Sequence, residues 1–282
     1  MTAYWNMVRP ANCGIAALSV GLGFYTVRGP ADPWPGILLY LLMASAFLMA
    51  GFGNVVNDLL DLDTDAVNRP GRPLPSGRAN VRRAFWLSNL LCLSGLACAR
   101  AAGVSFFFMA AAVGALLWLY NARLKRTVLY GNIAVSFLCG FTLLYGGALA
   151  VNWHRALWPA LLAFLLNLAR EIVKDMADVP GDRASGCGTL PVRYGTLWAA
   201  NAAAGVLLLL IFLIPRAYLS GAYDGRYLII AEFGVALPSL IVIFLLFRHR
   251  DNVRWLHRLS VALKTLMLLG LIAVLMGKGS AL

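Results

Sequence analysis

Acidic residues are scarce in this sequence. Only 12 of its 282 residues are Asp or Glu, against 24 Lys and Arg, and charged residues together make up 13% of the chain. A soluble domain carries about 25% charged residues. Hydrophobic residues reach 61%. This composition argues against an ordinary soluble domain and predicts an integral membrane protein built from α-helices.

Cysteine and histidine are too few and too scattered to suggest a zinc site or a catalytic pair. The five cysteines contain no CxxC pair, and four of them lie in apolar runs, which is typical of small buried side chains. The three histidines, at positions 154, 249 and 257, have no spacing that suits a shared metal ion. The N-terminus lacks a charged segment and a cleavage site, so we expect its first apolar run to be a retained helix.

Nine apolar runs are long enough to span a bilayer, since a spanning helix needs about 20 mainly apolar residues. They are residues 11–27, 36–60, 84–100, 103–121, 131–151, 157–177, 196–214, 227–247 and 258–276. Small-residue pairs such as Gly21-x-Gly23 and Gly146-Gly147 favour close helix packing. Because no segment is long and polar enough for a separate soluble domain, we predict one all-α polytopic domain, residues 1–282, with nine transmembrane helices.

The distribution of Lys and Arg predicts the orientation of this bundle. The side with the N-terminus and the loops after spans two, four, six and eight holds fifteen of them, and the opposite side holds six. Cytoplasmic loops carry the excess of positive charge. We therefore expect these loops on the cytoplasmic side of the cell membrane. The net charge of +12 is explained by this rule and by phosphate-bearing substrates, and we expect no nucleic-acid partner.

The few acids are concentrated in two short stretches, which close the second and sixth apolar runs. Eight of the 12 lie there: Asp58, Asp61, Asp63, Asp65, Glu171, Asp175, Asp178 and Asp182. In each stretch three aspartates follow an i, i+3, i+7 spacing, which places them on one face of a helix. Asp63 projects to the other side. Stacked carboxylates repel one another, so a solvated polar helix end is a weaker explanation than a bound cation such as Mg²⁺.

Cationic and amide side chains accompany both acidic stretches. The loop after the first stretch is stiffened by prolines and carries three arginines, so it is a candidate anion clamp. Four other candidates also have an explanation that involves no substrate. Arg9 could be an anchor that extends its charge to the membrane surface, and Tyr120 could belong to the aromatic belt at that surface. Lys174 and Arg183 could simply neutralise neighbouring acids. The candidate substrate-binding residues are Arg9, Asn12, Asn54, Arg69, Arg72, Tyr120, Lys125, Lys174 and Arg183.

Acidic stretches and cations at one membrane face are typical of a metal–diphosphate site. Mg²⁺ ions that bridge diphosphate oxygens stabilise the leaving group as its C–O bond breaks. With an allylic prenyl diphosphate, departure leaves a resonance-stabilised cation that an acceptor can attack. The apolar helices would hold the prenyl tail and exclude water.

The motifs resemble those of the UbiA superfamily of intramembrane prenyltransferases. They are Asn57-Asp58-x2-Asp61-x3-Asp65, Asn68-Arg69-Pro70-x-Arg72-Pro73-x-Pro75-Ser76-Gly77 and Asp178-x3-Asp182. The resemblance covers nearly the whole chain and implies nine transmembrane helices, with the motifs after helices two and six. It also implies an Mg²⁺ cofactor and a prenyl diphosphate donor. The implied metal–diphosphate residues are Asn57, Asp58, Asp61, Asp65, Asp175, Asp178 and Asp182, with Arg72 and Lys125 on the diphosphate.

Within the family, the segment from Arg170 to Asp182, followed by Thr189-Leu190-Pro191, is most similar to the digeranylgeranylglyceryl phosphate synthases. These ether-lipid enzymes transfer a geranylgeranyl group from its diphosphate to a lipophilic glyceryl phosphate. An aromatic acceptor, as in the quinone, chlorophyll and haem O branches, remains an alternative. A cation transporter or channel is a third, although the other seven spans lack the deep acids that an ion pathway requires.

Overall fold

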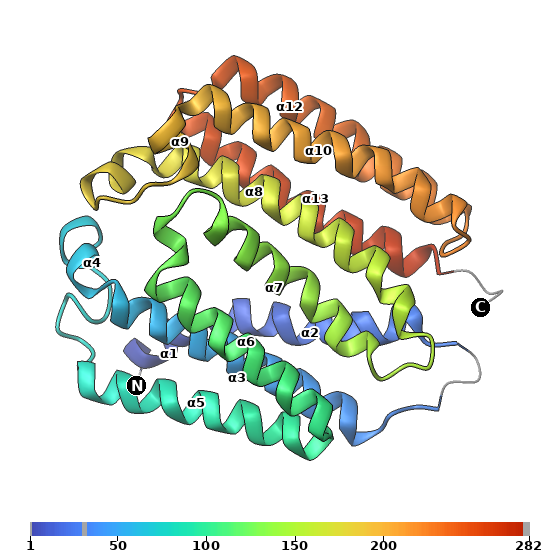
Figure 1. Ribbon diagram of the computed structural model, residues 1–282, viewed down its shortest axis with the longest axis horizontal. Coiled ribbons are helices and arrows are strands. Elements are labelled where there is room, and N and C mark those ends of the chain that lie inside the picture. The colour runs from blue at the N-terminus through green and yellow to red at the C-terminus, as the bar shows by residue number, and fades with distance from the viewer. Residues whose placement is uncertain (1, 30–32, 279–282) are drawn as a thin grey trace. The chain divides into compact units, whose positions relative to one another are not determined.

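The computed structural model describes residues 2–29 and 33–278, and every regular element within them is a helix (Figure 1). The predicted all-α class is confirmed. The described chain divides into two compact units. The first comprises residues 2–25, 33–124 and 142–151, and the second comprises residues 26–29, 125–141 and 152–278.

The first unit is built around α3 and α5, which lie side by side (Figure 1). Its helices are α1 (Thr2–Val8), α2 (Pro10–Val27), α3 (Ile37–Leu60), α4 (Leu62–Asn68), α5 (Val81–Ala102), α6 (Val104–Ala122) and the end of α7 (Tyr130–Gly147). Buried Met7, Val55, Leu74 and Leu91 belong to one apolar cluster. This cluster joins the N-terminal helix to the end of α3, where the first acidic stretch begins.

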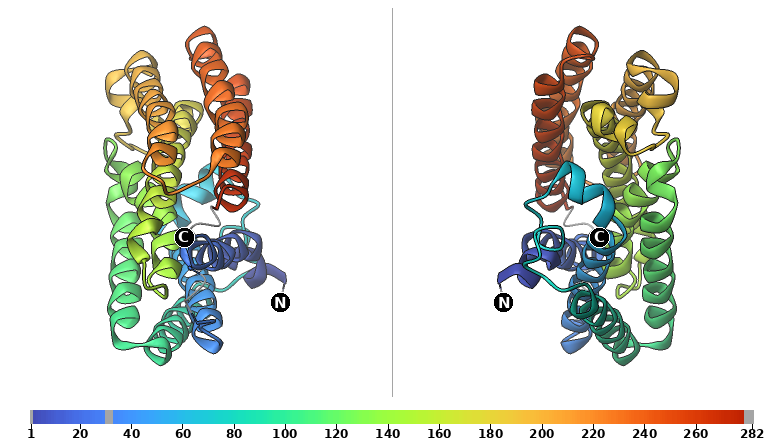
Figure 2. Two further views of the ribbon diagram at one scale, coloured as in Figure 1. Left: turned by 90° about the vertical axis from the view of Figure 1, so that its right-hand side faces the viewer. Right: turned by 90° about the vertical axis from the view of Figure 1, so that its left-hand side faces the viewer.

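The second unit is built around α8, which packs against α10 and α13 (Figure 1), and the side views in Figure 2 show the long helices from α8 to α13 running alongside one another. Its elements are η1 (Leu124–Arg126), the start of α7, η2 (Trp153–Ala156), α8 (Leu157–Ala184), α9 (Leu190–Tyr194), α10 (Thr196–Leu219), α11 (Gly225–Ala231), the π-helix η3 (Glu232–Ala236), α12 (Leu237–His249) and α13 (Val253–Met276). Its core is apolar, with Ile172, Leu207 and Leu263 almost fully buried.

Eight helical segments of the described chain are long and apolar enough to cross a membrane. They are Pro10–Val27, Ile37–Leu60, Val81–Ala102, Val104–Arg126, Trp153–Ala184, Thr196–Leu219, Gly225–His249 and Val253–Met276. They correspond to eight of the nine predicted runs. The ninth run, 131–151, coincides with α7, an 18-residue helix that contains the buried polar residues Asn132 and Ser136. The count of nine spans therefore stays a prediction.

Two glycines allow the backbones of α2 and α7 to approach closely within the first unit. A Cβ atom on Gly23 would overlap the backbone of Leu143, and one on Gly146 would overlap the backbone of Val20. The expected role of small residues in helix packing is confirmed at these two positions. Gly21 is different, because a Cβ atom there would meet only a side chain, at ordinary contact distance.

We expect Gly146→Ala to lower the free energy of unfolding by roughly 1–3 kcal/mol, because two helix backbones must move apart to admit a methyl group. Thermal unfolding in detergent measures this loss. Gly14→Ala in α2 is the matched control, since its Cβ atom would meet nothing within 4 Å, and alanine favours a helix. Equal melting temperatures for the two variants would contradict the backbone contact.

Candidate active site

The first acidic stretch occupies the end of α3, a break at Asp61, and α4. The expectation of one continuous helical stripe needs correction here, because Asp61 has φ −97° and ψ 9° and separates the two helices. Helical hydrogen bonds nevertheless cross the break: the amide of Asp61 donates to Asn57 at 3.0 Å, and that of Asp65 donates to Asp61 at 2.7 Å. Asp63 is exposed, as its position off the stripe predicted.

Arginines neutralise the buried carboxylates of this stretch. Arg72 Nη1 lies 2.5 Å from Asp65 Oδ2 and 3.4 Å from Asp58 Oδ1, and Arg9 Nη2 lies 2.5 Å from the same Asp58 oxygen. The Asp58 and Asp65 side chains are only 7% and 8% exposed. Carboxylates in such surroundings need a partner of opposite charge, because burial removes their hydration. Arg9 and Arg72 provide it.

The position of Arg9 depends on an unusual backbone conformation. Arg9 has φ 56°, a left-handed value that is rare outside glycine, and it separates α1 from α2. Pro10 begins α2 and disfavours the helical conformation at the residue before it. Asn54 stabilises the corner, since its amide donates to Val8 O at 2.8 Å and its Oδ1 accepts from Arg9 at 3.4 Å. Arg9 is therefore paired with the first acidic stretch, and its contact with a substrate stays a prediction.

Asn57 and Asn121 form an amide pair beside Asp61. Asn57 Nδ2 donates to Asp61 Oδ2 at 3.0 Å and to Asn121 Oδ1 at 2.9 Å. Asn121, near the end of α6, is 3% exposed and donates to the backbone of Leu117 and Gly53. Asn121 is not among the site residues predicted from the sequence. An amide that closes an apolar run, next to the candidate Tyr120, was the signal available.

The second acidic stretch lies on one unbroken helix, α8, which continues through Pro180 to Ala184. Asp175 Oδ2 accepts a hydrogen bond from Asn132 Nδ2 at 2.8 Å, and Asp182 Oδ2 accepts one from Thr189 Oγ1 at 2.9 Å. Buried Ser136 donates to the backbone of Asn132 at 2.6 Å. Neutral donors therefore orient these carboxylates. Asn132 was also missed, because only the fold brings it to a residue 43 positions away.

Glu171 forms ion pairs with two cations of the second stretch. Its carboxylate is buried and is paired with Arg170 and with Lys174, whose Nζ lies 3.3 Å from Glu171 Oε2. Neutralisation of a neighbouring acid, one of the two explanations for Lys174, is therefore observed. Contact between Lys174 and a phosphate stays a prediction.

The remaining candidates lie at the surface or in loops. Asn12, in the first turn of α2, is exposed, as are Arg69 and Arg183. Tyr120 is half-buried in the last turn of α6 in the first unit, whereas Lys125 is half-buried in η1 and belongs to the second unit.

The donor atoms of both stretches suit Mg²⁺, since carboxylate and amide oxygens are its preferred protein ligands. Within the described parts of the chain, no three His, Cys, Asp or Glu side chains are grouped so that they could hold a metal ion. Metal binding by these residues stays a prediction.

Comparison with known proteins identifies the fold. The model of the UbiA prenyltransferase family matches residues 16–275. This chain belongs to that family. The digeranylgeranylglyceryl phosphate synthase of Methanopyrus kandleri is 40% identical over 276 residues, which are 98% of each chain. The enzyme of the same name from Thermococcus gammatolerans is 36% identical over 277 residues, again 98% of each chain.

Solved structures of UbiA proteins have the same architecture. A structure described as digeranylgeranylglyceryl phosphate synthase in membranes matches with a TM-score of 0.84 and 27% identity, over 100% of this chain and 99% of that one. A UbiA homologue from Archaeoglobus fulgidus bound to DMAPP and Mg²⁺ matches with a TM-score of 0.70 at 18% identity, over 97% of this chain and 99% of that one. The predicted UbiA-type membrane fold is confirmed, and the chain is an integral membrane protein.

The ion pairs of Arg72 predict an energetic coupling with the acids. Arg72→Gln should lower the free energy of unfolding by roughly 1–3 kcal/mol, less than for a fully buried pair because the guanidinium is 22% exposed. Adding Asp65→Asn should recover part of this loss, because one uncompensated charge is removed. Thermal unfolding in detergent measures both variants.

Arg69→Gln is the matched control, since Arg69 is an exposed arginine of the same loop. A change within about 0.5 kcal/mol is expected there. Strictly additive losses for Arg72→Gln and Asp65→Asn would contradict the coupling.

Proposed function

We propose that this protein transfers a prenyl group, geranylgeranyl, from its diphosphate to an isoprenoid glyceryl phosphate in ether-lipid biosynthesis. The observation that carries this proposal is the 40% identity, over 98% of both chains, to a digeranylgeranylglyceryl phosphate synthase. The all-oxygen acidic stretches with their neighbouring arginines support the same reaction class. Residues 1–282 would then act as one prenyltransferase domain.

The proposed site residues for metal and diphosphate are Asn57, Asp58, Asp61, Asp65, Asp175, Asp178 and Asp182. Bound Mg²⁺ would supply positive charge that stabilises the departing diphosphate. Asn121, Asn132 and Thr189 would orient these ligands, because they already donate hydrogen bonds to Asn57, Asp175 and Asp182. Such supporting hydrogen bonds fix ligands in the geometry that binding requires.

Arg9 and Arg72 would contact the diphosphate directly. Both guanidinium groups are partly exposed, at 32% and 22%, although their carboxylate partners are buried. Arginine binds phosphate oxygens with paired N–H donors as readily as it binds carboxylates. When the carboxylates engage the metal, the arginines would therefore turn to the diphosphate without losing a charged partner. Further substrate contacts are proposed for Asn12, Asn54, Arg69, Tyr120, Lys125, Lys174 and Arg183.

In the proposed reaction the C–O bond between the allylic carbon and the diphosphate breaks, and its electron pair leaves with the diphosphate. The acceptor hydroxyl oxygen then forms a new C–O bond to the allylic cation and loses its proton. Water would hydrolyse that cation, so the surrounding helices must keep the reacting carbon dry. The protein's apolar helices suit this requirement.

We further propose that the protein lies in the cell membrane with both acidic stretches at the cytoplasmic face. The support is the excess of Lys and Arg in the loops predicted on that side. Both substrates would then be drawn from the cytoplasmic leaflet.

We expect Asp61→Ala or Asp178→Ala to reduce turnover of geranylgeranyl diphosphate by at least about a hundredfold, because each removes a proposed metal ligand. Thermal unfolding should be little changed, as neither side chain belongs to the apolar core. Asp63→Ala is the control: this exposed acid lies in α4, two residues after Asp61 and away from the stripe. Product formation is measured by mass spectrometry. Near-normal rates for the first two variants, or an equal loss in Asp63→Ala, would contradict the assignment.

Chelation of divalent metal by EDTA should stop product formation, and added Mg²⁺ should restore it, because the proposed ligands are all oxygen donors. The acceptor is tested in the same assay, with geranylgeranylglyceryl phosphate and with an aromatic acid offered separately. We expect prenylated lipid phosphate and no prenylated aromatic product. The reverse result would show that the protein is a prenyltransferase whose acceptor is aromatic. Ion flux in liposomes without any prenyl diphosphate would instead support a transporter.

A further inference from the structure

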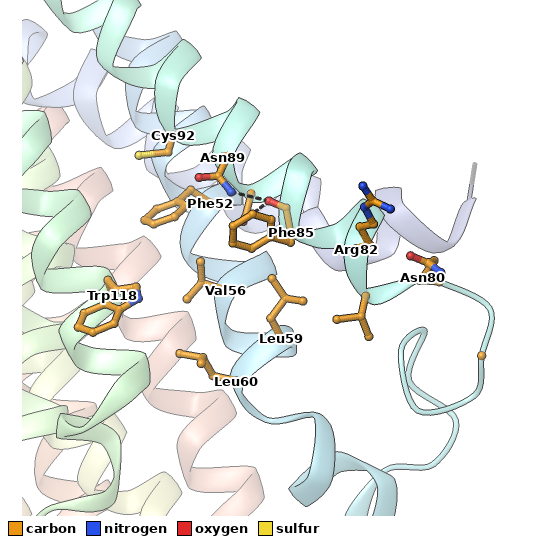
Figure 3. Close-up of a pocket in the computed structure, with 14 residues that line it drawn as sticks. Phe52, Val56, Leu59, Leu60, Asn80, Arg82, Phe85, Asn89, Cys92 and Trp118 are labelled. Carbon is orange, nitrogen blue, oxygen red and sulfur yellow. Dashed lines mark hydrogen bonds between the residues drawn. The ribbon is translucent and has the colours of Figure 1, made fainter.

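A groove of about 1160 Å³ opens on the first unit between α3, α5 and the end of α6 (Figure 3). Its lining from α3 consists of Phe52, Val56, Leu59 and Leu60. At about 100° per residue these four positions lie on the side of α3 opposite Asp58. The groove is therefore separate from the acidic site, although both use the same end of α3.

The far wall of the groove is aromatic and apolar along most of its length. Phe85 and Cys92 of α5 and Trp118 of α6 line it, and the Phe85 and Trp118 side chains are 52% and 55% exposed. Such large exposed aromatic groups on helices that can span a membrane face hydrocarbon chains. A long apolar chain is the occupant that suits this wall.

One end of the groove is cationic and polar. Arg82 and Asn80 lie where α5 begins (Figure 3). Arg82 is exposed, and its side chain makes no ion pair or hydrogen bond within the described chain. Asn80 Oδ1 accepts from the amide of Arg83 at 3.2 Å and so begins the helix, whose N-terminal end carries a partial positive charge. A negatively charged group is the complement of this end.

We infer that the groove binds one membrane lipid with a phosphate headgroup. The phosphate lies against Arg82 at the start of α5, and a hydrocarbon chain runs along Phe52, Phe85 and Trp118. A single arginine near a membrane surface favours an anionic headgroup, and the aromatic wall favours a chain over a free anion. Lipid binding here needs no catalytic step, so it is independent of the proposed reaction.

Native mass spectrometry of the purified protein with phosphatidic acid, or with diacylglycerol of the same chains, tests the binding. We expect phosphatidic acid to bind more tightly. Arg82→Gln should weaken it about fivefold. Arg83→Gln is the matched control, because it removes the same charge from the next residue, which does not line the groove. Equal losses in the two variants, or equal binding of diacylglycerol, would overturn the inference.

Cys92 gives a second measurement in the unmodified protein, because it lines the groove (Figure 3). Cys98 is not among the residues that line it. We expect phosphatidic acid to slow the reaction of Cys92 with N-ethylmaleimide severalfold and to leave Cys98 unchanged. Glycerol phosphate, which has the anion and no chain, should protect neither. Protection of both thiols, or equal protection by glycerol phosphate, would show that no lipid occupies this groove.

Discussion

The burial of Asp58 and Asp65 is the constraint on which the first half of the site depends. A carboxylate removed from water must be neutralised or paired, and both of these aspartates are paired with arginines. This requirement explains why Arg9 takes a left-handed conformation between two helices, and why the loop after α4 brings Arg72 back over the end of α3. The charges therefore account for the local backbone at Arg9 and at the loop that carries Arg72.

The second acidic stretch meets the same constraint by different means. Asn132 and Thr189 supply neutral hydrogen bonds to Asp175 and Asp182, while Arg170 and Lys174 are taken up by Glu171. A neutral donor orients a carboxylate but does not by itself balance its charge. Lys174 also interacts electrostatically with Asp175 and Asp182, whereas Asp58 and Asp65 are each paired directly with an arginine. The two stretches share a spacing and differ in whether arginines or neutral donors contact their carboxylates.

Helical segments and acid spacing could be predicted because they are local properties of the chain. Eight predicted spans correspond to observed helical segments, and Asp63 falls outside the stripe as its spacing required. The partners of the acids could not be predicted in the same way. Arg9 and Asp58 are 49 residues apart, and Asn57 and Asn121 are 64 apart, so only folding brings them together. The break at Asp61 could not be predicted from the sequence either. Hydrogen bonds on both sides of it keep the acids at a helical spacing, so their pattern does not reveal the break.

The two faces of α3 show how one helix can serve two kinds of ligand. Its spacing places Asn54, Asn57 and Asp58 toward the polar network and Phe52, Val56 and Leu59 toward an apolar groove. The residues after Arg72 reach that groove as well, since Gly77, Ala79 and Asn80 line it. A rigid helix and a proline-stiffened loop therefore connect a charged site to a membrane-facing surface. A shift of this loop would change both the charged site and the groove, because the same short segment borders each of them.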